Sequence, residues 1–365
     1  MLKRNQADNR LVDMPEFGTN PGRLKALVHL PSSLPENPPL VVVLHGCTQS
    51  AAAYDSGSGW SELADRQGFA LLYPEQQRAN NGNLCFNWFQ SSDITRGSGE
   101  AESIREMIGH LTETQGIDPA RVFVTGLSAG GAMADVMLAT YPEVFAAGAI
   151  IAGLPYGTAT SVGEAFERMQ GRNEPSAEDL QSLLARASRN KKDWPRVSVW
   201  QGTHDHTVKP RNAGLILEQW KAVHGISDAE PDLEKIGDHS HKIWRDRNGH
   251  VALESYVIQG MGHGVPLATE AHQPVGETGP YMLSADISST ARIAHFFGLL
   301  DLADIRLAEH TDKPKQASTP RMANPVARLS AKIKPRKAVK VEEQPSEIGV
   351  TKVIHDALRA AGLMK

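Results

Sequence analysis

The first residue that could do chemistry is a serine between two glycines. Ser128 lies in the pentapeptide GLSAG at 126–130, directly after the β-branched and aromatic run 122–125. That run predicts a strand, and the small residues after the serine begin a helical pattern. A serine at such a junction takes a strained backbone conformation, and the glycines two positions away let the strand and the helix pass without a clash of Cβ atoms. The motif predicts a nucleophilic hydroxyl at the carboxyl edge of a sheet; the alternative is a tight turn with an ordinary serine.

A serine hydroxyl needs a base to remove its proton, and the base needs a carboxylate to orient it. Asp205 follows the predicted strand 197–200, and His263 follows the predicted strand 255–258. The carboxyl ends of parallel strands gather at one edge of a sheet, where ligand and catalytic groups lie. We therefore predict that Asp205 orients His263 and that His263 is the base for Ser128. The alternative for His263 is an ordinary loop histidine.

The loop around Asp205 allows other interpretations. Asp205 could cap a helix, because threonine and proline residues lie beside it. His204 and His206 flank it, but an H-x-H pair with one nearby carboxylate is a weak indication of a metal site. Asp238 and Asp246 are poorer candidates for the orienting acid, because no strand lies directly before either of them.

Nucleophilic attack by a serine on a carbonyl group also needs backbone donors for the oxyanion of the tetrahedral intermediate. Losing one such donor typically costs about 3 kcal/mol of transition-state stabilisation. One predicted donor is the N–H of Ala129, which follows the nucleophile. The other is the N–H of Cys47, in the loop 45–49 after the apolar run 40–44. We interpret His45 as a structural residue of this loop rather than as a second base.

The elements that must position these groups alternate between strands and helices. Predicted strands cover 24–30, 40–44, 69–74, 122–125, 146–152, 197–200 and 255–258, and predicted helices cover 60–67, 100–115, 129–140 and 288–300. This order, with continuous apolar strands, predicts an α/β fold whose mostly parallel central sheet has helices on both faces. Residues 154–194 read as short amphipathic helices, which we interpret as an insertion over the sheet and a candidate cap.

Composition divides the chain into a body and a tail. Residues 1–20 are predicted to be a flexible lead-in, 21–305 a catalytic domain, 306–345 a basic linker rich in Pro, Lys and Ala, and 346–365 an amphipathic helix. The net charge of −4 combines an acidic body with this basic tail, a pattern that does not predict nucleic-acid binding. The tail either adheres to an anionic surface or polymer granule through its linker and helix, or is a soluble linker whose helix covers the body.

Several classes of protein are excluded or disfavoured. The first 20 residues show no apolar core of a signal peptide, and no run approaches the roughly 18 apolar residues of a membrane span, so no transmembrane segment is predicted. With only two cysteines, Cys47 and Cys85, the chain has neither a zinc site of four thiolates nor a disulfide-dense scaffold.

Five motifs in order resemble the short-chain poly(3-hydroxybutyrate) depolymerase family of esterases, which is similar to feruloyl and acetylxylan esterases. They are LVVVLHGCTQ at 40–49, CFNWF at 85–89, IDPARVFVTGLSAGG at 117–131, WQGTHDHTV at 200–208 and GMGHG at 260–264. The resemblance covers roughly residues 20–300 and implies an α/β-hydrolase fold. It also implies the triad Ser128, Asp205 and His263 and an oxyanion hole that includes the Cys47 amide.

The resemblance further implies a disulfide bond between Cys47 and Cys85. It indicates an extracellular protein, whereas the missing signal peptide favours the cytoplasm, where free thiols are the default. The compartment and the redox state of the two cysteines therefore stay open at this point.

These observations lead to one hypothesis and two alternatives. The hypothesis is a serine esterase that hydrolyses short-chain polyhydroxyalkanoate (polyhydroxybutyrate) or its oligomers and needs no metal or organic cofactor. The alternatives are a feruloyl or acetylxylan-type carbohydrate esterase and, in another class, a non-catalytic binding protein on the same fold. Acyl chain length and oligomeric state are not predicted.

Four aromatic residues are candidates for the wall of an acyl or polymer cleft, because apolar surfaces suit a methyl-bearing polyester. They are Trp60, Trp88, Phe89 and Tyr156. Ordinary core packing is the alternative for each of them.

Overall fold

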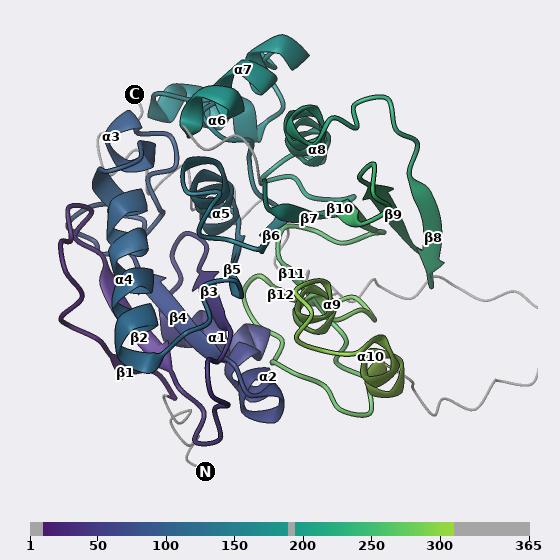
Figure 1. Cartoon of the computed structure of the whole chain (residues 1–365). Helices are drawn as coiled ribbons and strands as arrows, with labels where there is room; N and C mark the ends of the chain where they lie inside the picture. Colours follow the sequence, from purple (N-terminus) through teal and green to yellow (C-terminus); the bar gives the residue numbers. More distant parts are fainter. Residues whose placement is uncertain (1–9, 189–193, 310–365) are drawn as a thin grey trace, which may run out of the picture. The chain divides into compact units, whose positions relative to one another are not determined.

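The computed structural model describes residues 10–188 and 194–309. Its centre is a ten-stranded sheet with the order β1-β2-β4-β3-β5-β6-β7-β10-β9-β8 (Figure 1). The strands from β4 to β10 in that order are parallel, and the two strands at each edge pair antiparallel. The strands are β1 Val12–Asp13, β2 Lys25–His29, β3 Leu40–Leu44, β4 Ala70–Glu75, β5 Val122–Leu127, β6 Ala147–Ile151, β7 Arg196–Gly202, β8 Asp232–Ile236, β9 His239–Arg245 and β10 Val251–Ile258. Two further strands, β11 Val265–Leu267 and β12 Met282–Ser284, form a separate parallel pair.

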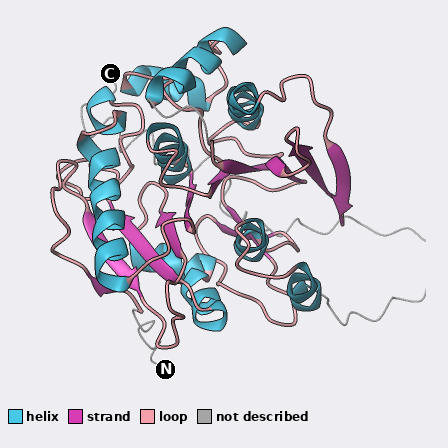
Figure 2. Ribbon diagram, viewed as in Figure 1, coloured by secondary structure: helices cyan, strands magenta, loops and turns pink. Residues whose placement is uncertain are grey.

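Helices cover both faces of the sheet (Figure 2). Residues of α4, α5 and α8 pack on one face, and residues of α1, α2 and α9 pack on the other. The helices are α1 Ala51–Ser58, α2 Trp60–Gln67, α3 Ser91–Ile94, α4 Gly99–Gln115, α5 Ala129–Thr140, α6 Val162–Met169, α7 Ala177–Ala187, α8 Arg211–His224, α9 Ser289–Phe296 and α10 Leu302–Glu309. The predicted α/β-hydrolase architecture is therefore confirmed.

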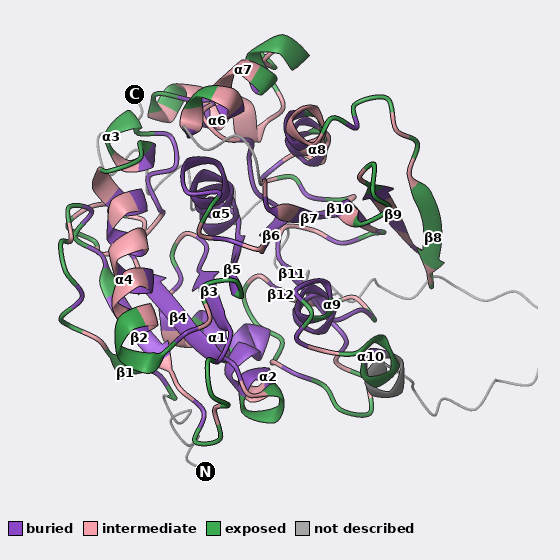
Figure 3. Cartoon of the chain, in the orientation of Figure 1, coloured by how far each residue is buried: buried purple, intermediate pink, exposed green. Residues whose placement is uncertain are grey.

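The core lies on both faces of the central strands (Figure 3). All five residues of β3 have no exposed surface, because Val42 faces the α4–α5 side while Val41 and Val43 face the α1–α9 side. A strand buried on both faces needs apolar side chains at every position, which accounts for its continuous apolar run. Strand β8 is the opposite case, since four of its five residues are exposed.

The lead-in and the domain end differ from the prediction. Residues 10–20 belong to the folded domain, because β1 pairs with β2 and the side chains of Leu11 and Phe17 are buried. The flexible lead-in predicted for 1–20 is thus wrong for 10–20, and residues 1–9 lie outside the described part. Helix α10 continues to Glu309, past the predicted domain end at 305. The remainder of the predicted linker and the helix 346–365 also lie outside the described residues.

The segment after β6 packs on the helical layer. Leu180 and Leu184 of α7 are fully buried, and the side-chain amide of Gln219 in α8 donates to Leu180 O at 3.1 Å. Asn212, also in α8, donates to Arg168 O at 3.0 Å. These contacts fix α6 and α7 against α8, and a role of this segment as a cap over substrate stays a prediction.

In the described residues, no helix combines the length and the hydropathy that crossing a membrane requires.

Candidate functional site

Ser128 lies at the turn where β5 ends and α5 begins. Its backbone has φ 58° and ψ −118°, and its N–H donates to Ile151 O at 2.9 Å. A Cβ added at Gly126 would lie 2.4 Å from Gly130 O, and one added at Gly130 would lie 2.3 Å from Leu44 O. Because neither approach tolerates a side chain, the two glycines are required for strand and helix to pass, as the motif predicts.

Parallel pairing brings the carboxyl ends of four strands to one edge of the sheet. In the strand register, Leu127 of β5 is next to Ile151 of β6, and Ile151 is next to Trp200 of β7. Strand β7 in turn ends opposite β10, with Gly202 beside Ile258. The loops that carry Ser128, Asp205 and His263 leave this edge from β5, β7 and β10, as predicted.

Asp205 and His263 are in direct contact. The Nδ1 of His263 lies 2.7 Å from Oδ2 of Asp205. The other carboxylate oxygen, Oδ1, accepts from the backbone N–H groups of Thr207 at 2.9 Å and Val208 at 2.8 Å. A carboxylate acceptor at Nδ1 favours the tautomer with its proton there, which leaves Nε2 free to accept a proton. Asp205 does not cap α8, whose N-cap is Pro210.

Ser128 and His263, unlike Asp205 and His263, are not in hydrogen-bond contact within the described residues. Within the described residues, the Ser128 hydroxyl makes no hydrogen bond to the imidazole. Catalytic hydrogen bonds are often long before substrate binds and tighten in the substrate complex. The proton transfer from Ser128 to His263 therefore stays a prediction.

Gln201 is a site residue that the sequence analysis misses. Its Nε2 donates to Asp205 Oδ2 at 2.9 Å and to Val208 O at 3.2 Å, and its side chain is buried. Both partners are acceptors, which fixes the orientation of the amide. Gln201 thus holds the carboxylate oxygen that receives His263. No sequence pattern predicts this role, because it depends on the folded loop after β7, which brings Asp205 and Val208 to the side chain of Gln201.

The loop after β3 leaves one amide available. Gly46 N–H donates to Gln49 Oε1 at 2.8 Å, Thr48 N–H to Asn83 O at 2.7 Å, and Gln49 N–H to Gly46 O at 3.3 Å. Among the amides of 46–49, that of Cys47 has no acceptor within the described residues. Ala129 is the first residue of α5, so its N–H has no acceptor within the helix.

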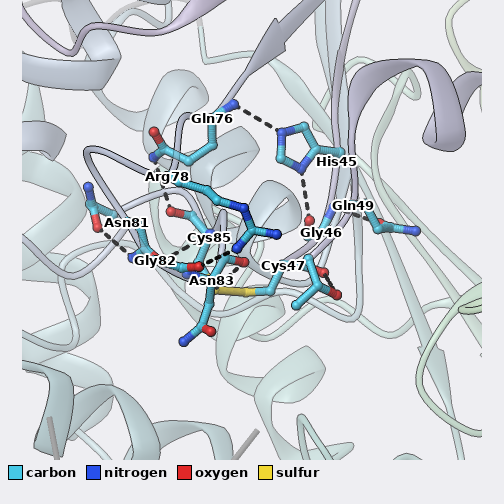
Figure 4. The surroundings of a disulfide bond; sticks show 12 residues. His45, Gly46, Cys47, Gln49, Gln76, Arg78, Asn81, Gly82, Asn83 and Cys85 are labelled. Atoms are coloured by element: carbon cyan, nitrogen blue, oxygen red, sulfur yellow. Dashed lines mark hydrogen bonds between the residues drawn. A yellow bond between two sulfur atoms is a disulfide. The ribbon is translucent and has the colours of Figure 1, made fainter. Parts of the chain in front are cut away.

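A disulfide bond joins this loop to the segment after β4 (Figure 4). The sulfur atoms of Cys47 and Cys85 are 2.07 Å apart. His45 Nδ1 donates to Gly46 O at 2.8 Å, and its Nε2 accepts from Gln76 N–H at 3.1 Å. Burial lowers the pKa of His45. The imidazole is therefore a neutral part of the loop, as we interpret it from the sequence.

A buried carboxyl group supports the other side of the disulfide. The side-chain amide of Gln76 donates to Cys85 O at 3.0 Å and to Oε1 of Glu100. Glu100 also accepts from the backbone and side-chain nitrogen atoms of Asn87, each at 2.8 Å. Burial raises the pKa of Glu100 to about 8. Buried hydrogen-bonded side chains thus restrain the segments on both sides of the disulfide, His45 beside Cys47 and Gln76 and Glu100 beside Cys85.

The four aromatic residues predicted to line a cleft differ from one another in burial, since three are buried and one is partly exposed. Trp60 is only 2% exposed and packs edge-to-face on Phe69 with ring centroids 6.2 Å apart, so its predicted place in the cleft is wrong. Trp88 and Phe89 are 5% and 9% exposed and pack on each other in the core beside α4 and α5. Tyr156 is partly exposed, and its N–H donates to Asp135 at 2.8 Å. Substrate contact by the last three residues stays a prediction.

Other candidate ligands and acids are not brought together. His204 and His206 are exposed, and the described residues contain no group of three or more His, Cys, Asp or Glu placed to hold a metal ion. Asp246 follows β9, which is antiparallel to β10, so it lies at the edge of the sheet opposite His263. Asp238 is an exposed residue of the turn between β8 and β9.

Comparisons with known proteins agree with this geometry. Residues 24–245 match the sequence profile of a family described as Esterase PHB depolymerase. The chain is 46% identical over 298 residues to poly(3-hydroxyalkanoate) depolymerase C of Paucimonas lemoignei, covering 80% of this chain and 70% of that protein. It is 31% identical over 265 residues to acetylxylan esterase A of Aspergillus oryzae, covering 70% of this chain and 85% of that protein.

A solved structure supports the same relationship. The acetyl xylan esterase from Aspergillus awamori superposes with a TM-score of 0.68 at 26% identity, covering 79% of this chain and 99% of that chain. Profile, sequence and fold therefore agree: the chain belongs to the PHB depolymerase family of esterases and is a carboxylic ester hydrolase with the α/β-hydrolase fold.

Proposed function

We propose that the protein hydrolyses short-chain polyhydroxyalkanoate or its oligomers through an acyl-enzyme on Ser128. The observation that carries the proposal is the 2.7 Å contact between Asp205 Oδ2 and His263 Nδ1, at the edge of the sheet where Ser128 lies on its strained turn. The substrate class is supported by the 46% identity to a relative named as a poly(3-hydroxyalkanoate) depolymerase.

The reaction proceeds by acyl transfer to water. His263 Nε2 accepts the proton of the Ser128 hydroxyl as Oγ attacks the ester carbonyl carbon. The N–H groups of Cys47 and Ala129 donate to the oxyanion of the tetrahedral intermediate. His263 then gives its proton to the leaving alkoxide, and water repeats the sequence on the acyl-enzyme. For a polyester, both the leaving alcohol and the released acid are hydroxyacyl fragments.

The surroundings of Asp205 suit this role. Two backbone N–H groups and the amide of Gln201 donate to the carboxylate, while His263 occupies the remaining position on Oδ2. Every donor restrains the plane of the carboxylate, so the imidazole is held in one orientation while it gains and loses a proton.

A second candidate function is the hydrolysis of carbohydrate-linked acetyl or feruloyl esters. The specific observation in its favour is the fold match to an acetyl xylan esterase, which this chain covers almost completely at 99%. This function would use the same three side chains, and only the substrate would differ.

Replacing the proposed nucleophile tests the mechanism. Ser128→Ala removes the attacking oxygen, so we expect kcat for p-nitrophenyl butyrate to fall about 10⁴-fold or more, with an unchanged melting temperature. Ser92→Ala, which alters an exposed serine, is the matched control and keeps wild-type turnover. Turnover by Ser128→Ala at the rate of the control would rule out this residue as the nucleophile.

A substrate panel tests the proposed specificity. We expect kcat/KM for soluble 3-hydroxybutyrate oligomers to exceed that for methyl ferulate and acetylated xylan by at least about tenfold, which corresponds to roughly 1.4 kcal/mol in transition-state binding. Initial rates with the purified enzyme provide the comparison. A preference for acetylated xylan or methyl ferulate would reverse the substrate assignment and leave the triad in place.

Removing the disulfide tests the oxyanion loop. In the double variant Cys47→Ser and Cys85→Ser, we expect stability to fall by about 3–4 kcal/mol, because the bond closes a loop of 38 residues. We also expect kcat to fall about tenfold or more well below the melting temperature, because the Cys47 N–H loses its fixed position. A variant that melts earlier but keeps wild-type kcat would show that the bond only stabilises the fold.

A further inference from the structure

We propose that Tyr281 is a specificity residue that contacts the substrate beside His263 and donates a hydrogen bond to a second carbonyl group of a hydroxyacyl oligomer. This inference rests on the proposed role of His263 as the base. It deepens the proposed function by naming a group that separates oligomeric hydroxyacyl esters from simple esters.

The ring of Tyr281 lies against the proposed base. The centroids of the Tyr281 and His263 rings are 6.0 Å apart and their planes meet at 82°, an edge-to-face contact. Tyr281 comes from the segment before β12, whereas His263 comes from the loop before β11. The parallel pairing of β11 with β12, in which Val265 is next to Met282, brings these two segments together.

The hydroxyl of Tyr281 is available to a ligand. The side chain is partly exposed, and within the described residues no group makes a hydrogen bond to its hydroxyl. Two other tyrosine hydroxyls in the same domain are engaged, since Tyr73 donates to Asp55 and Tyr141 donates to Glu102. A tyrosine whose ring packs against a neighbouring side chain, and whose hydroxyl makes no hydrogen bond within the described residues, is suited to hold a polar atom of a substrate.

The backbone at Tyr281 is held in a conformation that a bulky residue rarely adopts. Its φ is 64°, in the left-handed region that favours glycine. The carbonyl of Tyr281 accepts from Val265 N–H at 2.8 Å, and a Cβ added at Gly264 would lie 2.6 Å from that carbonyl oxygen. The residue after the base must therefore be glycine for Tyr281 to take this place. Strain of this kind persists where surrounding structure enforces it, and it occurs frequently at functional sites.

The chemistry of the substrate indicates what the hydroxyl would bind. A hydroxyalkanoate oligomer repeats an ester carbonyl in every unit, so a second carbonyl follows the scissile ester at a short, fixed number of bonds. A p-nitrophenyl alkanoate has only the carbonyl that reacts. A phenol whose ring lies against the base can donate its O–H to the second carbonyl of the oligomer and has no equivalent partner in the simple ester. Losing such a bond lowers specificity only for the substrate that makes it.

The test is the ratio of two specificity constants. For Tyr281→Phe, which keeps the ring and its contact with His263, we expect kcat/KM for the soluble 3-hydroxybutyrate trimer to fall about tenfold. We expect kcat/KM for p-nitrophenyl butyrate to change less than about twofold. The ratio is independent of the fraction of folded enzyme, because both substrates are measured on the same preparation. Tyr54→Phe is the matched control and keeps the wild-type ratio, because it removes a buried hydroxyl of α1 that has no hydrogen-bond partner among the described residues.

A wild-type ratio in Tyr281→Phe, whatever its absolute activity, would overturn the proposal. Failure of the proposed triad gives a different result, because it would leave Ser128→Ala active on both substrates. The two ideas can therefore fail separately.

Discussion

The parallel register of β5, β6, β7 and β10 is the constraint on which the site depends. It places three loops at one edge of the sheet and brings Asp205 and His263, 58 positions apart in the sequence, within 2.7 Å of each other. A strand rises about 3.3 Å per residue, and a slip of one residue also turns every side chain to the other face. Such a slip would break a contact of this length, so the buried apolar faces that fix the register also position the proposed catalytic groups.

The start of α5 positions the loop that follows β3. The turn at Ser128 and the close approach of Gly130 to the carbonyls of Leu44 and His45 place the loop after β3 against the N-terminus of the helix. Free N–H groups and the helix dipole make that end a favourable place for negative charge. The disulfide at Cys47 and the hydrogen bonds of His45 restrain the loop from the other side. In the proposed mechanism, the oxyanion therefore meets N–H donors whose positions are fixed before substrate binds.

Most of the helices and strands and the three proposed triad residues could be predicted from local sequence patterns. The features that could not be predicted have physical causes. Helix α2 has the predicted bounds 60–67, because Gly68 ends it in the left-handed region with φ 72°. Strand β8 is missed because four of its five residues are exposed and its sequence shows no apolar alternation. The role of Gln201 is missed because it depends on contacts formed only in the folded chain. Trp60 is wrongly assigned to a cleft because sequence does not separate a core aromatic from one that lines a pocket.

The proposed mechanism requires the hydroxyl of Ser128 and the imidazole of His263 to act as one unit. A double-mutant cycle in kcat with p-nitrophenyl butyrate measures this directly, with Ser128→Ala, His263→Ala and the double variant. Residues that act as a unit give non-additive effects, so we predict that the double variant has a kcat within about threefold of either single variant. If the double variant instead loses the product of the two single losses, the two side chains act independently and the proposed triad is wrong.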